Sequence, residues 1–368
     1  MKVLSLVSYT VFPARTGGQR GIALMEQYLA READLVCVTV RSNDPKYAAY
    51  PVLNILSNSP LRYINPFYFF TLRSIIRRER ITHLLLEHPY YGWLGILLKK
   101  FAGVKLIVHS HNIEATRWKN LGKWWWKLLY YYEKYTHRQA NYNLFIHEAD
   151  RQFAIQQYGV LPEHCIVATY GLEMAAIPSK DECREIKKQI KQQHTISEDE
   201  QLLLFNGAFN YAPNLEALNA LINQVNPLLQ QQTGFRYKIV VCGINIPDAI
   251  SQGSWPNIII AGFADDISRY FKAADVFLNP VVDGGGIKTK LVEALGYNCN
   301  AVSAQNGAIG VDPQCCNGKL LVTGNNDWPA FAAAIPVAAG IKADTPQAFF
   351  DHFYWGNIAK KVVAFIGH

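Results

Sequence analysis

The sequence predicts an α/β protein built from two doubly wound, Rossmann-like domains. Its 368 residues are about twice the usual length of one domain. Half of the residues are hydrophobic and 18% are charged, a composition typical of a globular chain and unlike that of disordered, collagen-like or coiled-coil proteins. Short β-branched runs alternate with helical patterns in both halves, and this alternation predicts parallel strands joined by crossover helices.

The first half shows the alternation most clearly. Runs such as HLLLEH and LIVHSH become polar only at their ends, as expected for strands that are buried on both faces and open into a crevice at their carboxyl ends. We expect strands at 3–12, 35–41, 83–88 and 105–112, and helices at 21–33, 66–80 and 91–102.

The second half repeats the pattern after a charged stretch at 179–200, which we interpret as an exposed helix with loops near the domain junction. The predicted domains are residues 1–172 and 173–348, and the amphipathic segment 349–368 is expected to pack back on the first domain. Two such sheets would face a central cleft, where ligands of α/β sheets bind. Beyond the charged stretch we expect strands at 202–205, 237–243, 257–261, 276–280 and 301–303, and helices at 214–232, 267–274, 287–295 and 328–339.

The charge is distributed unevenly. Residues 1–172 hold 21 Lys and Arg against 11 Asp and Glu, a net +10, whereas the rest of the chain holds 15 against 18, a net −3. A basic half indicates an anionic partner, either a phospholipid surface or a nucleic acid, and a basic face without a partner is the alternative.

The sequence also predicts where the protein works. Its seven cysteines show no metal-like spacing, which indicates a reducing cytoplasm. No window of about 18 apolar residues occurs, and Pro13 and Arg15 interrupt the apolar start before any cleavage signal, so we interpret that start as a buried strand. We therefore expect a cytoplasmic protein.

The most informative segment is PVVDGGGIKTKLVEALG at 280–296, where a strand runs into Asp283 and three glycines before a helix expected from Ile287. The amides of Gly284, Gly285 and Gly286, with the helix N-terminus, can form an anion nest for a phosphate or diphosphate. On that helix Gly286, Lys290 and Glu293 would share one face. Lys290 can then neutralise phosphate oxygens while Glu293 accepts hydrogen bonds from sugar hydroxyls, and an ordinary surface Lys–Glu pair after a flexible turn is the alternative.

A second glycine segment, FPARTGGQRG, lies at 12–21 between the first strand and the first helix. Gly17 and Gly18 can present amides to phosphate, and Arg20 adds positive charge. The segment lacks the G-x-G-x-x-G spacing of the dinucleotide fingerprint. A plain strand-to-helix turn explains it equally well.

His109 and His111 end the strand IVHSHNIE. Alternation places both imidazoles on the same side of the strand, and the polar run that follows indicates that the chain has reached the crevice. His111 could therefore donate a hydrogen bond to a sugar hydroxyl and stabilise developing charge. A core histidine is the alternative, more so for His109.

The stretch WKNLGKWWWKLLYYYEKY at 118–135 interleaves aromatic residues with Lys119, Lys123, Lys127 and Lys134. An amphipathic helix of this composition can lie on an anionic membrane. The same interleaving suits single-stranded nucleic acid. Ordinary core packing of aromatics at helical spacing is the third interpretation.

No G-x-S-x-G elbow, Walker motif or zinc signature occurs in the sequence. Serine hydrolases and phosphate-loop ATPases are therefore disfavoured. We expect neither a metal nor a resident cofactor.

Taken together, the motifs resemble those of GT-B glycosyltransferases, specifically the retaining glycosyltransferase family 4 and relatives that build bacterial surface polysaccharides and glycolipids. The resemblance covers nearly the whole chain and is most specific in the last three of its motifs. These motifs are TGGQRG at 16–21, HSHNIE at 109–114, NGAFNYAPN at 206–214, AGFADDI at 261–267, KAADVFLNP at 272–280 and GGGIKTKLVEALG at 284–296.

The resemblance implies a GT-B architecture in which the C-terminal domain binds a nucleotide-diphosphate sugar and the N-terminal domain binds the acceptor. It implies catalytic roles for His111, Lys290 and Glu293, with His111 contacting the sugar and Glu293 the ribose. The donor-binding residues that it implies are Gly17, Gly18, Arg20, Gly207, Gly262, Phe263, Ala264, Asp283, Gly284, Gly285, Gly286, Ile287, Lys288, Lys290 and Glu293.

Two departures from the family pattern concern the donor sugar. Many members carry a sugar-contacting Glu eight positions before the final one, and Gly285 stands there in this chain. Many also carry Arg and Lys after the first strand of the C-terminal domain, whereas NGAFNYAPN has no cation. Diphosphate neutralisation would then rest on Lys288, Lys290, Arg20 and helix amides, and the missing sugar contact on the backbone or Asp283.

The expected activity is transfer of a hexose or N-acetylhexosamine to a polysaccharide or lipid-linked acceptor, with retention, at the inner face of the membrane. The alternatives are a GT-B nucleotide-sugar epimerase, a non-catalytic nucleotide-sugar-binding protein and a nucleic-acid-modifying transferase. A doubly wound oxidoreductase would need the dinucleotide fingerprint that the first strand lacks. We expect peripheral contact with an anionic membrane through the basic N-terminal domain, and no nucleic-acid partner.

Overall fold

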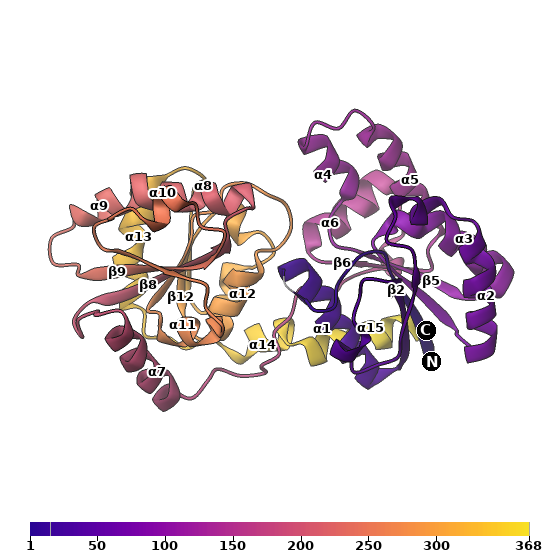
Figure 1. The fold of residues 1–368 in the computed structure, drawn as a ribbon, viewed down its shortest axis with the longest axis horizontal. Coiled ribbons are helices and arrows are strands. Elements are labelled where there is room, and N and C mark those ends of the chain that lie inside the picture. Colours follow the sequence, from indigo (N-terminus) through magenta and orange to yellow (C-terminus); the bar gives the residue numbers. More distant parts are fainter. Residues whose placement is uncertain (15, 368) are drawn as a thin grey trace. The chain divides into compact units, whose positions relative to one another are not determined.

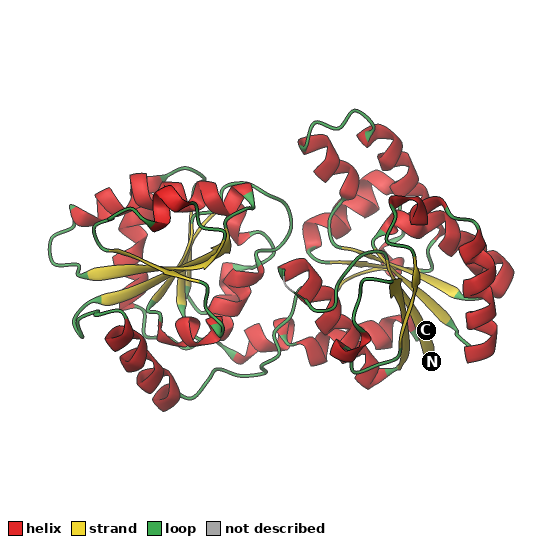
Figure 2. Cartoon of the chain, in the orientation of Figure 1, coloured by secondary structure: helices red, strands yellow, loops and turns green. Residues whose placement is uncertain are grey.

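The structure, a computed structural model, describes residues 1–14 and 16–367. The chain divides into two compact units: unit 1 comprises Met1–Glu173 and Phe353–His368, and unit 2 comprises Met174–His352. The first crossing lies one residue after the predicted boundary, and the chain returns to unit 1 at Phe353 rather than at 349. Both units are α/β and Rossmann-like, with helices on both faces of a parallel sheet (Figures 1 and 2).

The sheet of unit 1 has the strand order β3-β2-β1-β4-β5-β6-β7, and every neighbouring pair is parallel. Its three unpredicted strands are β3, β6 and β7, of which the last two have four and three residues, too short for a period to be read. The strands are β1 (Lys2–Val7), β2 (Asp34–Val40), β3 (Val52–Leu56), β4 (His83–Glu87), β5 (Lys105–Ser110), β6 (Tyr142–Phe145) and β7 (Cys165–Val167).

The helices of unit 1 include two that pack on one face of this sheet, α2 and α3, through a core of Leu, Ile and Val side chains. Elsewhere in unit 1, helix α15 packs against helix α1. The helices are α1 (Gly17–Glu32), α2 (Phe67–Glu79), α3 (Gly92–Ala102), α4 (Glu114–Asn120), α5 (Trp126–Gln139), α6 (Glu148–Phe153) and α15 (Trp355–Ile366), with short 3-10 turns at Pro60–Ile64 and Pro89–Tyr91. Helix α14 (Gln347–Phe353) belongs to unit 2 except for its last residue.

Helix α1 begins four residues earlier than predicted, so Gly17 and Gly18 lie in its first turn rather than in a loop. The reason is a capping box. The Thr16 hydroxyl accepts a hydrogen bond from the Gln19 amide, and the Gln19 side chain accepts one from the Thr16 amide, which satisfies two donors at the helix start.

The aromatic stretch 118–135, for which an amphipathic helix was one interpretation, forms two helices. Helix α4 ends at Asn120 and α5 begins at Trp126. Gly122 lies between them with a φ of 67°, a left-handed conformation that glycine adopts without strain and that ends helical geometry. The two helices form a hairpin that projects from unit 1 (Figure 1).

The C-terminal segment forms two helices, α14 and α15, which meet at Tyr354. The amide of Trp355 donates to the carbonyl oxygen of Leu172 at 2.9 Å. At the far end of α15, Nε2 of His83 lies 3.0 Å from the carbonyl oxygen of Ile366. These contacts join the last residues to the strands of unit 1.

The sheet of unit 2 has the order β10-β9-β8-β11-β12-β13 and is also parallel throughout. Helices α8, α9 and α13 pack on one face through a large apolar core. The strands are β8 (Gln201–Ala208), β9 (Tyr237–Ile244), β10 (Ile258–Gly262), β11 (Val276–Asn279), β12 (Asn300–Ala304) and β13 (Leu320–Thr323), and the helices are α7 (Lys180–Gln193), α8 (Ala212–Ala220), α9 (Asn226–Gln230), α10 (Asp248–Ser251), α11 (Ile267–Ala273), α12 (Thr289–Gly296) and α13 (Trp328–Gly340).

The charged stretch forms helix α7, which is mostly exposed, as predicted. It packs against α11 along one side, where Lys272 Nζ lies 2.6 Å from Glu182 Oε1. Within the described residues, none of the helices has both the length and the apolar character needed to cross a bilayer.

Candidate active site

Polar clusters lie at the corresponding place in both sheets. In each sheet the strand order reverses once, between β1 and β4 in unit 1 and between β8 and β11 in unit 2. Doubly wound sheets bind ligands at the carboxyl ends of the strands beside such a switch point. The candidate residues are therefore those that follow these strands.

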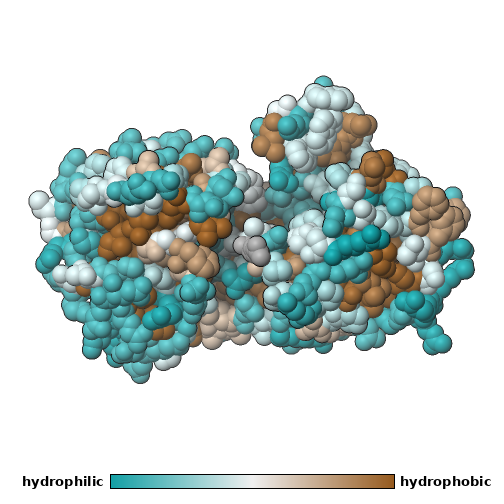
Figure 3. Space-filling model, viewed as in Figure 1, coloured by the Kyte–Doolittle hydropathy of each residue, from teal (hydrophilic) through white to brown (hydrophobic). Residues whose placement is uncertain are grey.

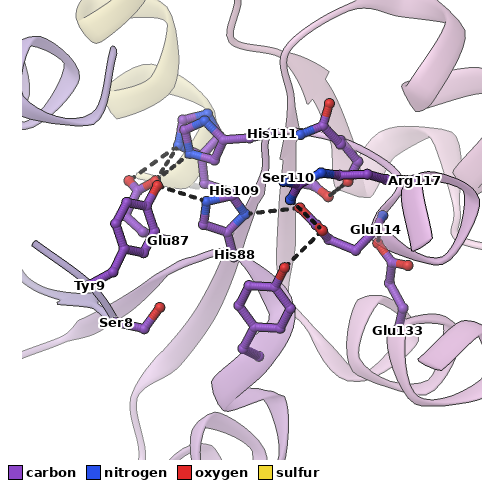
Figure 4. Close-up of polar contacts among 12 residues, drawn as sticks. Ser8, Tyr9, Glu87, His88, His109, Ser110, His111, Glu114, Arg117 and Glu133 are labelled. Atoms are coloured by element: carbon purple, nitrogen blue, oxygen red, sulfur yellow. Dashed lines mark hydrogen bonds and ion pairs between the residues drawn. The ribbon is translucent and has the colours of Figure 1, made fainter. Parts of the chain in front are cut away.

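Glu87 lies between two histidines at the end of β5. The register of the parallel strands β4 and β5 places Glu87 opposite His109. Glu87 Oε2 lies 2.7 Å from Nε2 of His111 and 3.0 Å from Nδ1 of His109 (Figure 4). The side chains of Glu87 and His109 are buried, whereas that of His111 is 14% exposed. His111 is therefore the member of this cluster that a ligand can reach most easily.

The electrostatics of the cluster give the Glu87 carboxylate and the His111 imidazole different charges. Although burial opposes ionisation of Glu87, His109 and His111 hold its pKa well below the usual range. Burial, together with the neighbouring His109 and His88, lowers the pKa of His111 to about 4. At neutral pH Glu87 is therefore ionised and His111 is neutral.

A third histidine, His88, joins this cluster across the switch point. Its Nε2 lies 3.0 Å from the hydroxyl of Tyr9, which follows β1. On its other side, Nδ1 lies 3.4 Å from Oε1 of Glu114, and the His88 and His111 rings lie 4.5 Å apart, centroid to centroid. Although burial opposes ionisation of Glu114, His88, Tyr90 and Arg117 lower its pKa to about 2.

The backbone of His88 is strained. Its φ is 73° and its ψ is 154°, a region that is populated almost only by glycine and that costs about 1 to 3 kcal/mol for another residue. Its amide donates to the carbonyl oxygen of His109 at 3.0 Å, which holds the strained residue against β5. Strain of this kind is typical of functional sites.

Glu133 holds the start of helix α4, which carries Glu114. Helix α4 has no side-chain cap of its own, and the buried Glu133 carboxylate instead accepts hydrogen bonds from the amides of Glu114 and Ala115, both at 3.0 Å (Figure 4). The hydroxyl of Tyr158 donates to the same carboxylate at 2.9 Å. Glu133 thereby fixes the start of α4 and with it the position of Glu114.

In unit 2, Lys288 holds the glycine turn that follows β11. Its Nζ donates to the carbonyl oxygens of Gly284, Gly286 and Gly285 at 2.8, 3.1 and 3.3 Å, while Asp283 accepts from the Gly284 amide at 2.6 Å. Gly284 and Gly286 have φ values of 85° and 70°, which favour glycine. Lys288 therefore stabilises the turn itself, a role that the sequence analysis did not assign to it.

Helix α12 begins at Thr289, two residues later than predicted, because Ile287 and Lys288 complete the turn. Gly286 therefore does not share a helix face with Lys290 and Glu293. The nearby Glu293 carboxylate raises the pKa of Lys290, although burial has the larger, opposite effect.

Lys290 reaches across to the end of β8. Its Nζ donates to the carbonyl oxygen of Asn206 at 2.8 Å and lies 3.4 Å from Oδ1 of Asn214. Burial lowers the pKa of Lys290 to about 8, and burial also lowers that of Lys288 to about 8. An ammonium group held by neutral oxygens and poorly hydrated is well prepared to bind an anion.

The remaining predicted donor residues of unit 2 lie in two places. Gly207 is in β8, opposite Gly243 of β9, next to the Lys290 contact. Strand β10, at the edge of the same sheet and two strands from β8, ends at Gly262 and is followed by Phe263 and Ala264. The structure thus places Gly207 beside the Lys290 cluster and the β10 segment further along the carboxyl edge.

In unit 1 the predicted residues Gly17 and Gly18 are exposed in the first turn of α1. Amides of a first helical turn have no partner within the helix and can bind an anion. Arg20 Nη2 lies 3.2 Å from Glu173 Oε2, and both side chains are about half exposed. A phosphate would therefore compete with Glu173 for Arg20.

Several residues of these clusters were not predicted from the sequence. Glu87 and His88 end the strand HLLLEH, and the available signal was that this strand neighbours IVHSHNIE in a doubly wound sheet, so their polar ends meet. The other unnamed residues are Tyr9, Glu114, Glu133, Asn206 and Asn214.

Among the described residues, Glu87, His109 and His111 form a group whose possible metal-ligand atoms lie within 4.8 Å of one another. In this structure Glu87 contacts both imidazoles directly, at hydrogen-bonding distances. The contacts therefore satisfy the carboxylate without a further group.

Two family models match the chain, one in each unit. A model described as Glycosyltransferase Family 4 matches residues 15–173, and one described as Glycosyl transferases group 1 matches residues 200–337. Together they cover most of the sequence. A comparison with curated proteins gave no match.

Solved structures share the fold over nearly the whole chain. An Anabaena protein, HepE, in complex with UDP-glucose has a TM-score of 0.72 and 16% identity, covering 100% of this chain and 99% of that one. A sucrose-phosphate synthase from Thermosynechococcus elongatus has a TM-score of 0.73 and 15% identity, covering 100% and 98%. A glycosyltransferase from Rickettsia africae has a TM-score of 0.72 and 12% identity, covering 99% and 97%.

Two Rossmann-like units with the same strand order, each with a polar cluster at its switch point, define a two-domain α/β protein of the GT-B class. Within that class the matched residues identify the family. The chain belongs to the GT-B glycosyltransferases of the family 4-like type.

Proposed function

We propose that this protein transfers a hexose or N-acetylhexosamine from a nucleotide-diphosphate sugar to a glycan or lipid-linked acceptor, with retention of anomeric configuration. The observation that carries the proposal is the partly buried Lys290 ammonium beside the glycine turn, at the switch point of unit 2. The HepE structures, which contain UDP and UDP-glucose, support a nucleotide sugar as donor.

The proposed role of unit 2 is to stabilise the leaving group. Departure of the nucleotide diphosphate leaves negative charge on the phosphates, which Lys290 and the first-turn amides of α12 can neutralise. Because these groups are already in place, little reorganisation is needed during the reaction, and each 1.36 kcal/mol of stabilisation gives about a tenfold rate increase. Glu293 would accept hydrogen bonds from the ribose.

The proposed role of unit 1 is to contact the transferred sugar through His111 and to bind the acceptor. The family resemblance implies that the acceptor attacks on the face from which the diphosphate leaves, and that a phosphate oxygen takes its proton. No metal has a part in these steps, because Lys290 and helix amides supply the positive charge.

The test is a panel of UDP, GDP, ADP and dTDP sugars offered to the purified protein with cell-envelope extract, with and without EDTA. We expect one donor to bind and its sugar to be transferred to an acceptor in the extract. NMR of the product should show retained anomeric configuration, and EDTA should have no effect on the transfer. Transfer with inversion, or transfer abolished by EDTA, would contradict the proposal. Isomerisation of the donor sugar in the absence of an acceptor would instead identify an epimerase. Binding of a donor without any turnover would identify a non-catalytic binding protein.

Diphosphate binding should weaken at alkaline pH. Because burial lowers the pKa of Lys290 to about 8, its ammonium is present below pH 8 and is lost above it. We expect the affinity for UDP, measured by calorimetry, to be level between pH 7 and 7.5 and to fall by about tenfold per unit well above pH 8. The Lys290→Arg variant keeps its charge and should lose less affinity over this range. Equal, flat profiles for both proteins would contradict the assignment.

The α4–α5 hairpin supports contact with an anionic membrane. Trp124, Leu128 and Tyr131 are 87%, 74% and 69% exposed, and Lys123 and Lys127 beside them are exposed as well. Brown apolar groups lie among hydrophilic ones on this projection (Figure 3). The opposite side of α5 packs inward, where Tyr132 donates to the carbonyl oxygen of Tyr90 at 3.0 Å. Core packing therefore explains only one face of the hairpin, and lipid would cover the other.

A double variant tests this membrane contact. Replacing Trp124 and Leu128 by serine should reduce binding to vesicles containing phosphatidylglycerol by at least about tenfold, because two large apolar side chains no longer enter the interface. Sedimentation with vesicles measures the effect, and phosphatidylcholine vesicles should bind the wild type weakly. The control is Val337→Ser, which alters an exposed residue of unit 2. Unchanged binding of the double variant, or preferential binding to DNA or RNA, would overturn the contact.

A further inference from the structure

We propose that Glu87 is a positioning residue that fixes the tautomer of His111, so that His111 offers Nδ1 to a ligand as a hydrogen-bond acceptor. From the sequence, we expected His111 to donate a hydrogen bond to a sugar hydroxyl. The assignment of the tautomer depends only on contacts within unit 1. The consequence for the sugar rests on the proposed function.

Two imidazoles share the carboxylate of Glu87. Oε2 of Glu87 lies 2.7 Å from Nε2 of His111 and 3.0 Å from Nδ1 of His109. An ionised carboxylate only accepts hydrogen bonds, so the nitrogen that faces it on each ring must carry a proton. For His111 that nitrogen is Nε2.

A neutral imidazole carries one proton. Burial and the neighbouring histidines disfavour the charged form of His111, while the two imidazoles favour the ionised form of Glu87. With the single proton of His111 on Nε2, its Nδ1 keeps a lone pair. In the absence of Glu87, nothing in this pair of contacts would select Nε2 over Nδ1 as the protonated nitrogen.

The surrounding rings restrict rotation of the His111 ring. The centroid of His109 lies 4.3 Å away and that of His88 lies 4.5 Å away, and Ser110 Oγ donates to the carbonyl oxygen of Asn112 at 2.8 Å, which holds the backbone on both sides of His111. Turning the ring would break the 2.7 Å contact with Glu87 and leave a buried carboxylate oxygen with one partner fewer. The orientation of Nδ1 is therefore fixed before any ligand binds.

This orientation has a consequence for donor choice. A lone pair on Nδ1 accepts a hydrogen bond from a sugar hydroxyl, whereas it repels the lone pairs of a fluorine or an ether oxygen at the same position. The site would therefore require a free hydroxyl at one position of the donor sugar. Glu87 would act on that selection through His111, without touching the sugar.

The decisive experiment is nitrogen-15 NMR of the protein with labelled histidine at pH 7, in which protonated and unprotonated ring nitrogens are distinguished directly. The His111→Asn variant identifies the His111 signals by their loss. We expect His111 to be protonated at Nε2 only in the wild type. In Glu87→Gln, whose amide can donate to Nε2, we expect the proton to move to Nδ1. A wild-type His111 that is protonated at Nδ1, or at both nitrogens, overturns the proposal even if Glu87→Gln does not fold.

A binding measurement tests the consequence. With UDP-glucose and its singly fluorinated analogues as probes, we expect one analogue to bind the wild type at least about tenfold more weakly than UDP-glucose, and this difference to shrink in Glu87→Gln, in which Nδ1 becomes a donor. A difference that is the same in both proteins overturns the role of Glu87 in selection. If UDP-glucose does not bind the wild type, that choice of donor is wrong, and the NMR result still decides the tautomer.

Discussion

Replacing Lys290 by methionine is expected to lower the rate of sugar transfer by about 10² to 10³-fold, the loss typical of removing one preorganised group that stabilises transition-state charge. Methionine keeps much of the apolar stem but removes the ammonium that donates to the Asn206 carbonyl oxygen. Because that ammonium is partly buried, water replaces it less effectively than at the surface. Steady-state kinetics with the donor identified by the panel measure the effect.

The control for Lys290→Met is Lys342→Met, which removes an exposed ammonium from the same unit. We expect this control to retain full activity. Thermal unfolding should show that Lys290→Met remains folded, since it also removes the energetic penalty of burying a charge. Loss of less than about threefold in a folded Lys290→Met protein would remove Lys290 from the mechanism and leave the diphosphate to Lys288 and the helix amides.

Replacing Gly243 by alanine is expected to destabilise unit 2 by about 3 kcal/mol or more. A Cβ atom at this position would lie 1.8 Å from the carbonyl oxygen of Gly207 and 2.8 Å from the Phe209 ring. Gly207 and Gly243 are register partners in β8 and β9, so neither strand can move without breaking their pairing. The same displacement would shift Asn206, the partner of Lys290.

Urea unfolding followed by circular dichroism, with limited proteolysis to follow each unit, measures the destabilisation. Gly340→Ala is the matched control, because a Cβ placed there has no atom within 4 Å apart from those of its chain neighbours and its own helix backbone, and α13 ends at this residue. We expect its stability to equal or slightly exceed that of the wild type. Equal stabilities of Gly243→Ala and Gly340→Ala would show that the two strands can separate at this point without loss.

Much of the fold could be predicted because its signals are local. The alternation of apolar runs with helical patterns indicated two doubly wound sheets, and strands such as β4 and β5 were placed within a few residues of their observed ends. The shared side of His109 and His111 followed from the period of a strand. The helix start at Gly17 was missed, although the capping box of Thr16 and Gln19 is a sequence signal.

The partners of the site residues could not be predicted in the same way. Glu87 meets His111 because two strands pair in one register, and Lys290 meets Asn206 from 84 residues away. Likewise, Lys288 turned out to hold the glycine carbonyls, which spacing alone does not distinguish from a lysine that faces a phosphate. Gly122 divided the aromatic stretch into a hairpin and so determined which aromatics are exposed.

The sequence by itself determined the elements, the two-unit α/β class and the identity of the charged groups near the strand ends, because these depend on periods and residue types within one segment. Only the tertiary structure decided which group each of those charges faces, and therefore its protonation. A pKa or a tautomer depends on burial and on atoms a few ångströms away, and in this protein those atoms come from other strands and helices of the same unit.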